Sequence, residues 1–197
     1  MTIDTLEEYI MDQEAGKRAD LIIAGLGGQG ILMGGKILAD ASLSQYRNSL
    51  WLPSYGSRVR GGPSECTVIY SDNDIDSPVL TTADAVILVS SMLFKLFENR
   101  VSAGGYFIVE RAGLFDTLQR DDIKLVTVPA LGMALEMGER RASNMVLLGV
   151  YIGITHSISA PFVEGEIEKR FSAKEKALSL NLNAFRKGLA EAPKLVA

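Results

Sequence analysis

The chain has 197 residues, of which 47% are apolar and 22% charged, and its net charge is −4 at pH 7. These values predict one soluble globular domain and exclude a mainly disordered chain, and nucleic acid is a poor candidate for a partner because the basic excess that binds phosphates is missing. One cysteine, Cys66, and one histidine, His156, are too few for an iron–sulfur cluster or a structural zinc site. We expect Cys66 to be a small buried apolar residue and His156 to end a helix.

The N-terminal segment predicts a helical appendage. Thr5 and Glu8 have the spacing of a capping box, so a short helix should extend to about Glu14. Because the first residues are acidic rather than basic, we expect no secretory signal peptide and a cytoplasmic protein. The longest apolar run, residues 145–154, is too short to cross a membrane and predicts a buried helix. We therefore divide the chain into a helical appendage over residues 1–17 and one α/β domain over residues 18–197.

Short apolar segments alternate with helical patterns from residue 19 onward. This alternation is typical of an α/β protein, here a Rossmann-like three-layer fold with a mainly parallel central sheet. Too little sequence separates the second and third strands for a parallel crossover, so the third strand is expected to be antiparallel. The expected strands are 19–24, 49–52, 65–70, 85–90, 106–109 and 124–128, and the expected helices are 31–43, 92–100, 130–137, 144–156, 161–171 and 174–190.

A glycine-rich turn joins the first strand to the first helix. Gly25, Gly27 and Gly30 have the spacing of a dinucleotide-binding turn, in which glycines let a phosphate approach the amides at the start of the helix. Residues 48–53 hold neither the acid that binds a ribose nor a base for a 2′-phosphate, which argues against NAD(P). Ile37 occupies the place of the hydroxyl that a P-loop needs for Mg²⁺, which argues against a nucleotide triphosphatase. Two interpretations stay open, namely another phosphate-bearing ligand and close packing of strand against helix.

The polar loop over residues 53–63 follows the second strand, where open α/β sheets place ligands and partners. Its Pro-Ser-Tyr-Gly-x-x-x-Arg-Gly-Gly segment over residues 53–62, taken with Gly-Leu-Gly-Gly-Gln-Gly over residues 25–30, resembles the gamma subunit of 2-oxoacid:ferredoxin oxidoreductases. The resemblance covers about residues 20–190. It also includes Ile75-Asp76-Ser77-Pro78, Ala83-Asp84, Gly104-Gly105, Asn144-Met145 and the tail 181–185.

The resemblance implies a multisubunit enzyme that oxidatively decarboxylates a 2-oxoacid on thiamine diphosphate and transfers the acyl group to coenzyme A. Its electrons pass through iron–sulfur clusters to ferredoxin. The implied partners are alpha, beta and ferredoxin-like delta subunits, and thiamine diphosphate, Mg²⁺ and the clusters are expected on those partner subunits only. Pyruvate, 2-oxoisovalerate and 2-oxoglutarate all stay open as substrates, because substrate contacts are expected on the thiamine-bearing chains.

The resemblance assigns this chain two roles, coenzyme A binding and subunit contact. We expect no catalytic residue and no metal ligand, so the isolated chain should be inactive. The candidate coenzyme A residues are Gly27, Gly28, Gln29, Gly30, Lys36, Arg141 and Asn144, and the candidate interface residues are Tyr55, Arg58, Arg60, Gly61 and Gly62.

Several of these residues have ordinary alternative roles. Lys36, Arg58 and Arg141 could be solvated charges, Tyr55 could pack within its own loop, and Asn144 could cap the helix that follows it. For the whole chain, the alternatives are a free-standing NAD(P)-binding oxidoreductase and a structural spacer whose glycine turn binds nothing.

Overall fold

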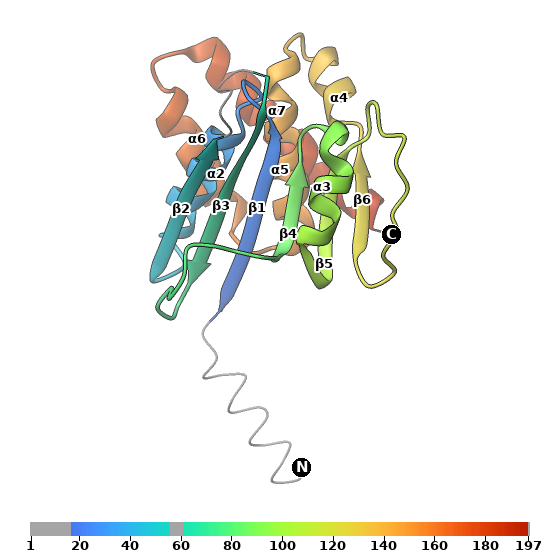
Figure 1. The fold of residues 1–197 in the computed structure, drawn as a ribbon. Helices are drawn as coiled ribbons and strands as arrows, with labels where there is room; N and C mark the ends of the chain where they lie inside the picture. The colour runs from blue at the N-terminus through green and yellow to red at the C-terminus, as the bar shows by residue number, and fades with distance from the viewer. Residues whose placement is uncertain (1–16, 56–60, 197) are drawn as a thin grey trace, which may run out of the picture.

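A computed structural model describes residues 17–55 and 61–196 of the chain (Figure 1). The helix expected near residues 5–14 lies outside this range. The strands are β1 (Arg18–Leu26), β2 (Asn48–Tyr55), β3 (Pro63–Ser71), β4 (Ala83–Leu88), β5 (Val101–Glu110) and β6 (Lys124–Val128). The α-helices are α2 (Ile31–Ser42), α3 (Phe94–Phe97), α4 (Ala130–Glu136), α5 (Ser143–Thr155), α6 (Ala160–Phe171) and α7 (Glu175–Leu195), and the 3₁₀ helices are η1 (Ser91–Leu93), η2 (Glu98–Arg100) and η3 (Arg140–Ala142).

The strands form one six-stranded sheet with the order β2-β3-β1-β4-β5-β6. β1, β4, β5 and β6 pair in parallel, whereas β3 is antiparallel to both of its neighbours, β1 and β2. The mainly parallel sheet and the antiparallel third strand are thereby confirmed. A dinucleotide-binding fold needs its second strand parallel to the first and beside it. Here antiparallel β3 takes that place, which counts against the NAD(P) alternative.

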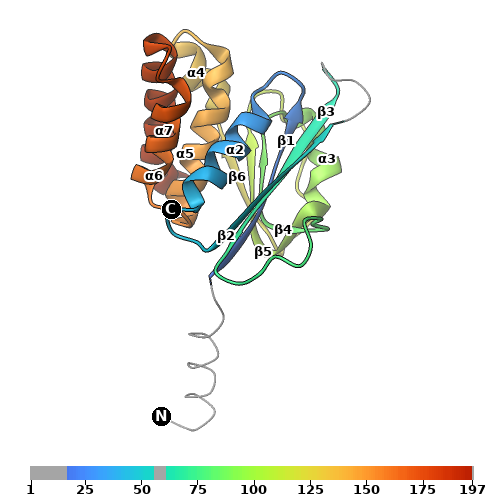
Figure 2. The ribbon, with the colours of Figure 1, turned by 90° about the vertical axis from the view of Figure 1, so that its left-hand side faces the viewer.

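Helices cover the two faces of the sheet unequally. α2, α4, α5, α6 and α7 lie on one face, and the short helix α3 lies on the other, so the expected three layers are present (Figure 2). The continuous helix expected over residues 92–100 is wrong, because this segment consists of η1, α3 and η2 in succession. Its two buried aromatic residues, Phe94 and Phe97, begin and end α3 and pack into the smaller core cluster, so only this one α-helical turn faces the sheet.

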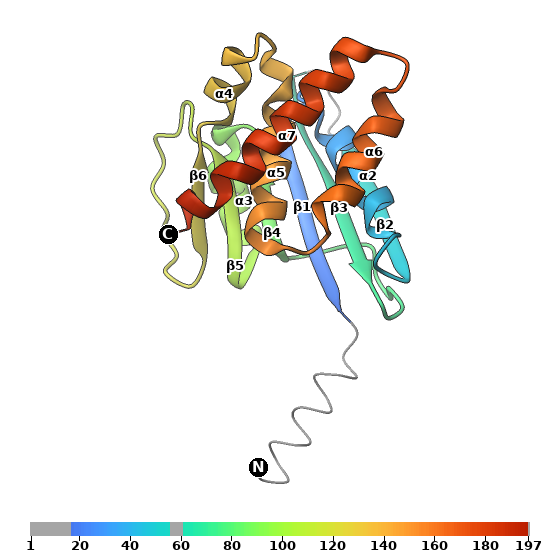
Figure 3. The same ribbon diagram turned by 180° about the vertical axis from the view of Figure 1, so that it is seen from behind.

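Helix α5 forms the centre of the larger core. Every residue from Ser143 to Ile152 is buried, because the sheet lies beneath the helix and α7 crosses above it (Figure 3). The predicted buried helix is thus confirmed, since a helix that is apolar on all sides needs cover on all sides. The two helices touch backbone to backbone: an added Cβ at Gly149 would fall on the carbonyl oxygen of Phe185, and one at Gly188 on that of Val146.

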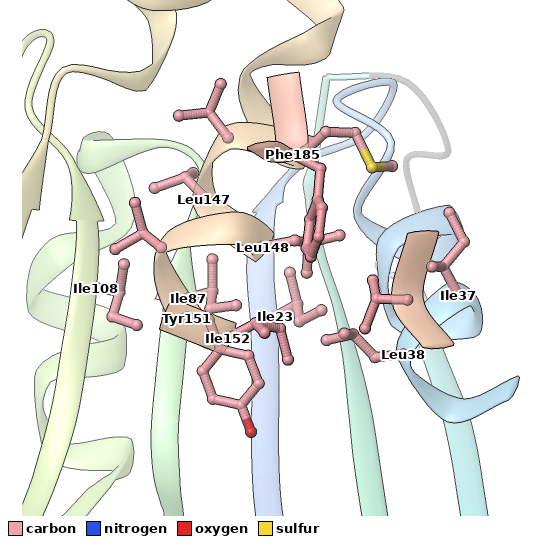
Figure 4. Close-up of a cluster of buried hydrophobic side chains, with 14 of the residues drawn as sticks. Ile23, Ile37, Leu38, Ile87, Ile108, Leu147, Leu148, Tyr151, Ile152 and Phe185 are labelled. Atoms are coloured by element: carbon pink, nitrogen blue, oxygen red, sulfur yellow. The ribbon is translucent and has the colours of Figure 1, made fainter. Parts of the chain in front are cut away.

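Side chains from the sheet and three helices meet in this core, as Figure 4 shows for ten labelled residues. Cys66 belongs to the same cluster and is completely buried, as expected, and burial raises the pKa of its thiol to about 12. His156 is exposed and ends α5 in the left-handed backbone conformation, with φ of 50°. None of the helices in the described part of the chain combines the length and the apolar character that a membrane crossing requires.

Candidate functional site at the carboxyl edge of the sheet

The glycine turn lies where β1 ends and α2 begins, at the carboxyl edge of the parallel strands (Figure 1). The side chain of Gln29 closes the turn, because its Oε1 accepts the Leu26 N–H at 2.7 Å while the Gln29 N–H donates to the Leu26 carbonyl at 3.2 Å. An added Cβ at Gly25 would come within 2.6 Å of that same Oε1. Gly25 is therefore needed for close packing of the turn.

Gly28 and Gly30 both have positive φ, 98° and 76°, but their surroundings differ. No atom lies within 4 Å of the position that a Cβ would take at Gly28, so the backbone there is open to an approaching ligand. Gly30 is the N-cap of α2 and has no side chain to cap the first amides of that helix. Amides at such a helix start attract anions.

Asn144 locks this turn against α5. It is 94% buried, its Nδ2 donates to the Gly30 carbonyl at 3.0 Å, and its Oδ1 accepts the Met145 N–H at 2.8 Å. The expected N-cap role is wrong, because α5 begins one residue earlier and Ala142 is its N-cap. A Cβ added to Gly30 would fall on the Asn144 amide nitrogen, so the two residues require each other.

Two hollows flank the turn, and both are lined by Gly28 and Arg141. The first, here called the Glu110 hollow, has a volume of about 310 Å³ and includes Gly27, Gln29, Gly61, Glu110, Arg140 and Ser143. The second, here called the Asn181 hollow, has a volume of about 360 Å³ and includes Gly30, Glu139, Asn144, Phe171, Leu180 and Asn181. Gly28 and Arg141 thus form a ridge between two cavities of the size that small ligands fill.

The ridge is positively charged. η3 places Arg140 and Arg141 beside the turn, and the Glu139 side chain fixes η3 by accepting the Arg141 N–H at 3.1 Å. Both arginines are exposed, and neither guanidinium forms an ion pair within the described residues 17–55 and 61–196. Guanidinium groups of this kind bind phosphates in a bidentate manner.

Glu110 lines the first hollow but is not among the candidate residues that the sequence pointed to. It ends β5 and is 4% exposed, and its two oxygens accept the N–H groups of Ala112 at 2.8 Å and Leu131 at 2.7 Å. Burial raises the pKa of this carboxyl, although the two hydrogen bonds act in the opposite direction. An acid directly after a buried apolar strand was the available signal.

The remaining candidates separate into three groups. Gly61 lines the Glu110 hollow, and the Gly62 carbonyl accepts the Gly27 N–H at 2.9 Å, so the structure brings these two interface candidates to the turn. Lys36 lines neither hollow and forms an ion pair with Asp40 on its own helix. Tyr55 is the last residue of β2, whereas residues 56–60, with Arg58 and Arg60, lie outside the described structure.

In the part of the chain that the structure covers, nowhere do three His, Cys, Asp or Glu side chains gather in a way that could hold an ion. What the carboxyl edge offers is open glycine backbone, uncapped helix amides and two arginines. Open backbone, uncapped helix amides and guanidinium groups are the kinds of group that bind anions.

Comparison with known proteins identifies the family. The profile of the pyruvate ferredoxin/flavodoxin oxidoreductase family matches residues 20–191. Ketoisovalerate oxidoreductase subunit VorA of Methanothermobacter marburgensis is 36% identical over 187 residues, which are 94% of this chain and 38% of that protein. The gamma subunit of a keto/oxoacid ferredoxin oxidoreductase from Geobacter sulfurreducens matches with a TM-score of 0.79 and 25% identity, over 91% of this chain and 98% of that chain.

A further solved structure is the 2-oxoglutarate:ferredoxin oxidoreductase of Magnetococcus marinus with 2-oxoglutarate, coenzyme A and succinyl-CoA bound. It matches with a TM-score of 0.82 and 24% identity, over 91% of this chain and 32% of that chain. The chain thus spans only 35% to 38% of the length of two VorA relatives but nearly all of the Geobacter gamma subunit. Since the family match covers almost the entire described region, and the gamma-type fold agrees with it, the chain belongs to the pyruvate ferredoxin/flavodoxin oxidoreductase family.

Proposed function

We propose that this chain is the gamma-type component of a 2-oxoacid:ferredoxin oxidoreductase, in which it holds coenzyme A at the glycine turn and contributes to assembly. The observation that carries the coenzyme A role is the ridge of Gly28 and Arg141 between two hollows. A diphosphate with an arm on each side fits that shape, since the open backbone at Gly28 admits a phosphate and Arg141 supplies charge. The bound coenzyme A of the Magnetococcus enzyme supports this choice of ligand.

The chemistry is assigned to partner subunits. In this proposal, alpha and beta subunits hold thiamine diphosphate and Mg²⁺, iron–sulfur clusters and a ferredoxin-like delta subunit carry electrons to ferredoxin, and the complex is cytoplasmic. The single thiol of this chain is buried with a pKa of about 12, so Cys66 is unsuited to hold a cluster. Coenzyme A supplies the thiol that accepts the acyl group, and this chain's residues bind and orient it.

The loop between β2 and β3 is the proposed subunit contact. The Gly62 carbonyl ties the end of this loop to Gly27, so a partner bound at the loop would lie next to the coenzyme A site. Arg58 and Arg60 are the proposed charged contacts there. Substituting Arg60→Ala should lower the yield of co-purified partner chains, measured by mass spectrometry after a pull-down, whereas the thermal unfolding of the isolated chain should stay as in the wild type.

The coenzyme A role is tested in the assembled complex with Arg141→Ala. We expect the KM for coenzyme A to rise about tenfold, the effect of losing one charge-assisted hydrogen bond, while the KM for the 2-oxoacid stays unchanged. Arg47→Ala is the matched control, because Arg47 is also an exposed arginine and lies between α2 and β2, outside both hollows. If the KM for coenzyme A is the same in both variants, coenzyme A does not bind at this turn.

A further inference from the structure

The two faces of the sheet are covered by very different amounts of helix. Five α-helices lie on one face, whereas the other, here called the α3 face, has only the single turn of α3 between η1 and η2 in the described part of the chain (Figure 2). The smaller core cluster fills the space between this segment and the sheet. Because a mainly parallel sheet is usually buried on both faces, the α3 face is where a further body would complete the cover.

The most exposed apolar side chains lie on this thinly covered face. Among the described large apolar residues, Phe115, Met92 and Val79 are the three most exposed, at 95%, 79% and 72%. Leu96, four positions after Met92 in the succession of η1 and α3, is also exposed. We call Val79, Met92, Leu96 and Phe115 the α3 patch. Single exposed apolar residues are ordinary, but a group of them on one face is typical of an interaction surface.

Hydrogen bonds fix the segments that carry the patch. The Arg100 guanidinium of η2 donates to the carbonyls of Leu80 at 3.0 Å and Thr81 at 2.8 Å, next to Val79. This single side chain therefore joins the segment between β3 and β4 to the end of η2.

The loop between β5 and β6 is fixed on both sides of Phe115. The Ser91 hydroxyl donates to the Ala112 carbonyl at 2.8 Å, and Lys95 Nζ donates to the Thr117 carbonyl at 2.8 Å. Phe115 thus projects from a backbone that is already held in place. An aromatic side chain on such a backbone loses little conformational entropy when a partner covers it.

The charges beside the patch indicate what kind of partner fits. Two acids and one base of the β5–β6 loop, Asp116, Asp121 and Arg111, are exposed and form no ion pair within residues 17–55 and 61–196. Residues 72–82, which include Val79, contain three acids and no base. A second copy related by a two-fold axis would bring these acids against one another, and an anionic membrane would repel them. A partner with basic groups around an apolar pocket fits the patch.

The α3 patch adjoins the proposed subunit contact. Gly61, at the end of the β2–β3 loop, lines the same hollow as Glu110, and Glu110 accepts the N–H of Ala112, whose carbonyl accepts the Ser91 hydroxyl. One partner can therefore cover both surfaces. In the VorA relative and the Magnetococcus enzyme, the region matched by this chain is 38% and 32% of the relative's chain, so a longer stretch of polypeptide accompanies it there.

We propose, on the basis of the proposed function, that the α3 patch docks the thiamine-bearing subunit of the oxidoreductase. That subunit has to lie beside the carboxyl edge, because the acyl group formed on it passes to coenzyme A there. It presents an apolar pocket to Phe115 and Met92 and basic side chains to Asp116 and Asp121. The patch supplies the apolar part of the contact, and the β2–β3 loop supplies a charged part.

A single introduced thiol tests whether the patch is covered. Cys66 is the only cysteine of the chain and is buried with a pKa of about 12, so the thiol of a Phe115→Cys variant is the one that a maleimide reaches. We expect labelling at least tenfold slower with saturating thiamine-bearing subunit than with the full chain alone. Phe162→Cys, on α6, is the control and should react equally fast in both states. Equal rates for Phe115→Cys overturn the proposal, as does a slow rate for the concentrated chain alone, which would assign the patch to a second copy.

Affinity gives a second readout. The Kd of the purified thiamine-bearing subunit for immobilised full chain should rise at least tenfold in the double variant Met92→Ser with Phe115→Ser. Both side chains point outward, so thermal unfolding should match the wild type. The control Leu135→Ser with Phe162→Ser removes exposed apolar side chains from α4 and α6 and should keep the wild-type Kd.

Charge reversal tests the basic groups of the partner. Asp116→Lys with Asp121→Lys should raise the same Kd, by a factor that shrinks at high salt. An unchanged Kd in both double variants, with a wild-type chain that binds, means that only this inference is lost, and an unchanged value for the charge reversal alone overturns the basic rim. If the thiamine-bearing subunit does not bind even the wild-type chain, the proposed function itself has failed.

Discussion

The two edges of the sheet both carry cavities, but their polar groups are used in different ways. At the amino edge, a hollow of about 580 Å³ is lined by Tyr46, Tyr151 and Ser157 among others. There the Tyr46 hydroxyl donates to the Ser157 carbonyl at 2.7 Å, the Tyr70 hydroxyl donates to Ser157 Oγ at 2.8 Å, and the Tyr70 and Tyr151 hydroxyls share a hydrogen bond. At the carboxyl edge, by contrast, Arg140 and Arg141 reach the hollows without an ion-pair partner among the described residues.

Cavity size alone is therefore a poor guide to a ligand site. The amino-edge hollow is larger than either hollow at the glycine turn, yet its hydroxyls satisfy one another and hold α5 against β3. Burial raises the pKa values of Tyr70 and Tyr151, so both phenols stay neutral at physiological pH. In the proposed function, the amino edge therefore serves stability and the carboxyl edge serves binding.

The largest effect is expected for Gly30→Ala. It places a side chain at φ of 76° and displaces the Asn144 amide, so the free energy of unfolding should fall by about 3 kcal/mol, from a left-handed backbone cost and a lost buried hydrogen bond. Denaturant unfolding of the isolated chain measures it. A loss below about 1 kcal/mol would show that Asn144 does not lock the turn.

The next largest effect is expected at the amino edge, for Tyr151→Phe. Removing this hydroxyl leaves those of Tyr70 and Ser157 with fewer partners, which should cost about 2 kcal/mol of unfolding free energy. The KM for coenzyme A in the assembled complex should equal that of the wild type. A raised coenzyme A constant in a folded Tyr151→Phe complex would break the division between the two edges.

Gly28→Ala should show a smaller loss of stability and a clear loss of binding. Its φ of 98° strains an alanine by about 1 kcal/mol, but no neighbouring atom opposes the new Cβ. The complex should assemble, show a several-fold higher KM for coenzyme A and keep its KM for the 2-oxoacid. If the KM values for coenzyme A and for the 2-oxoacid both match the wild type, Gly28 is needed only for the shape of the turn.

The smallest effect concerns the pH dependence of stability at Glu110. Because the folded-state pKa of Glu110 is raised above its ordinary value of 4.5, the native state holds this proton more tightly than the unfolded state. Its contribution to stability is therefore full below pH 4.5 and is lost as the pH rises through the folded-state pKa. Glu110→Gln cannot titrate, so its free energy of unfolding should fall less steeply than that of the wild type from about pH 4 to 7. Parallel curves would contradict the raised pKa.

The positions of the strands and helices, and the resemblance to the family, could be predicted from the sequence. Apolar runs located all six strands, and the uniformly apolar residues 145–154 indicated the buried helix that α5 contains. The short connection before residues 65–70 also predicted the antiparallel β3. These predictions succeeded because apolar periodicity and loop length depend on residues that are close together in the sequence. Both features directly indicate secondary structure and its burial. The glycine turn and the 53–62 loop were specific enough to suggest the family that the comparisons establish.

The assembly of the candidate site could not be predicted from the sequence, because it depends on contacts between distant segments. Asn144 reads as a helix cap in the sequence, yet it binds the carbonyl of Gly30, 114 positions away. Glu110 lies near Leu131 because its carboxylate accepts the Leu131 N–H, and Gly62 lies at the turn because its carbonyl accepts the Gly27 N–H. Lys36 follows Gly30 by only six positions, but the rotation of α2 about its axis keeps Lys36 out of both hollows. Such contacts depend on sheet order and helix rotation, which bring distant segments together and leave no periodic signal in the sequence.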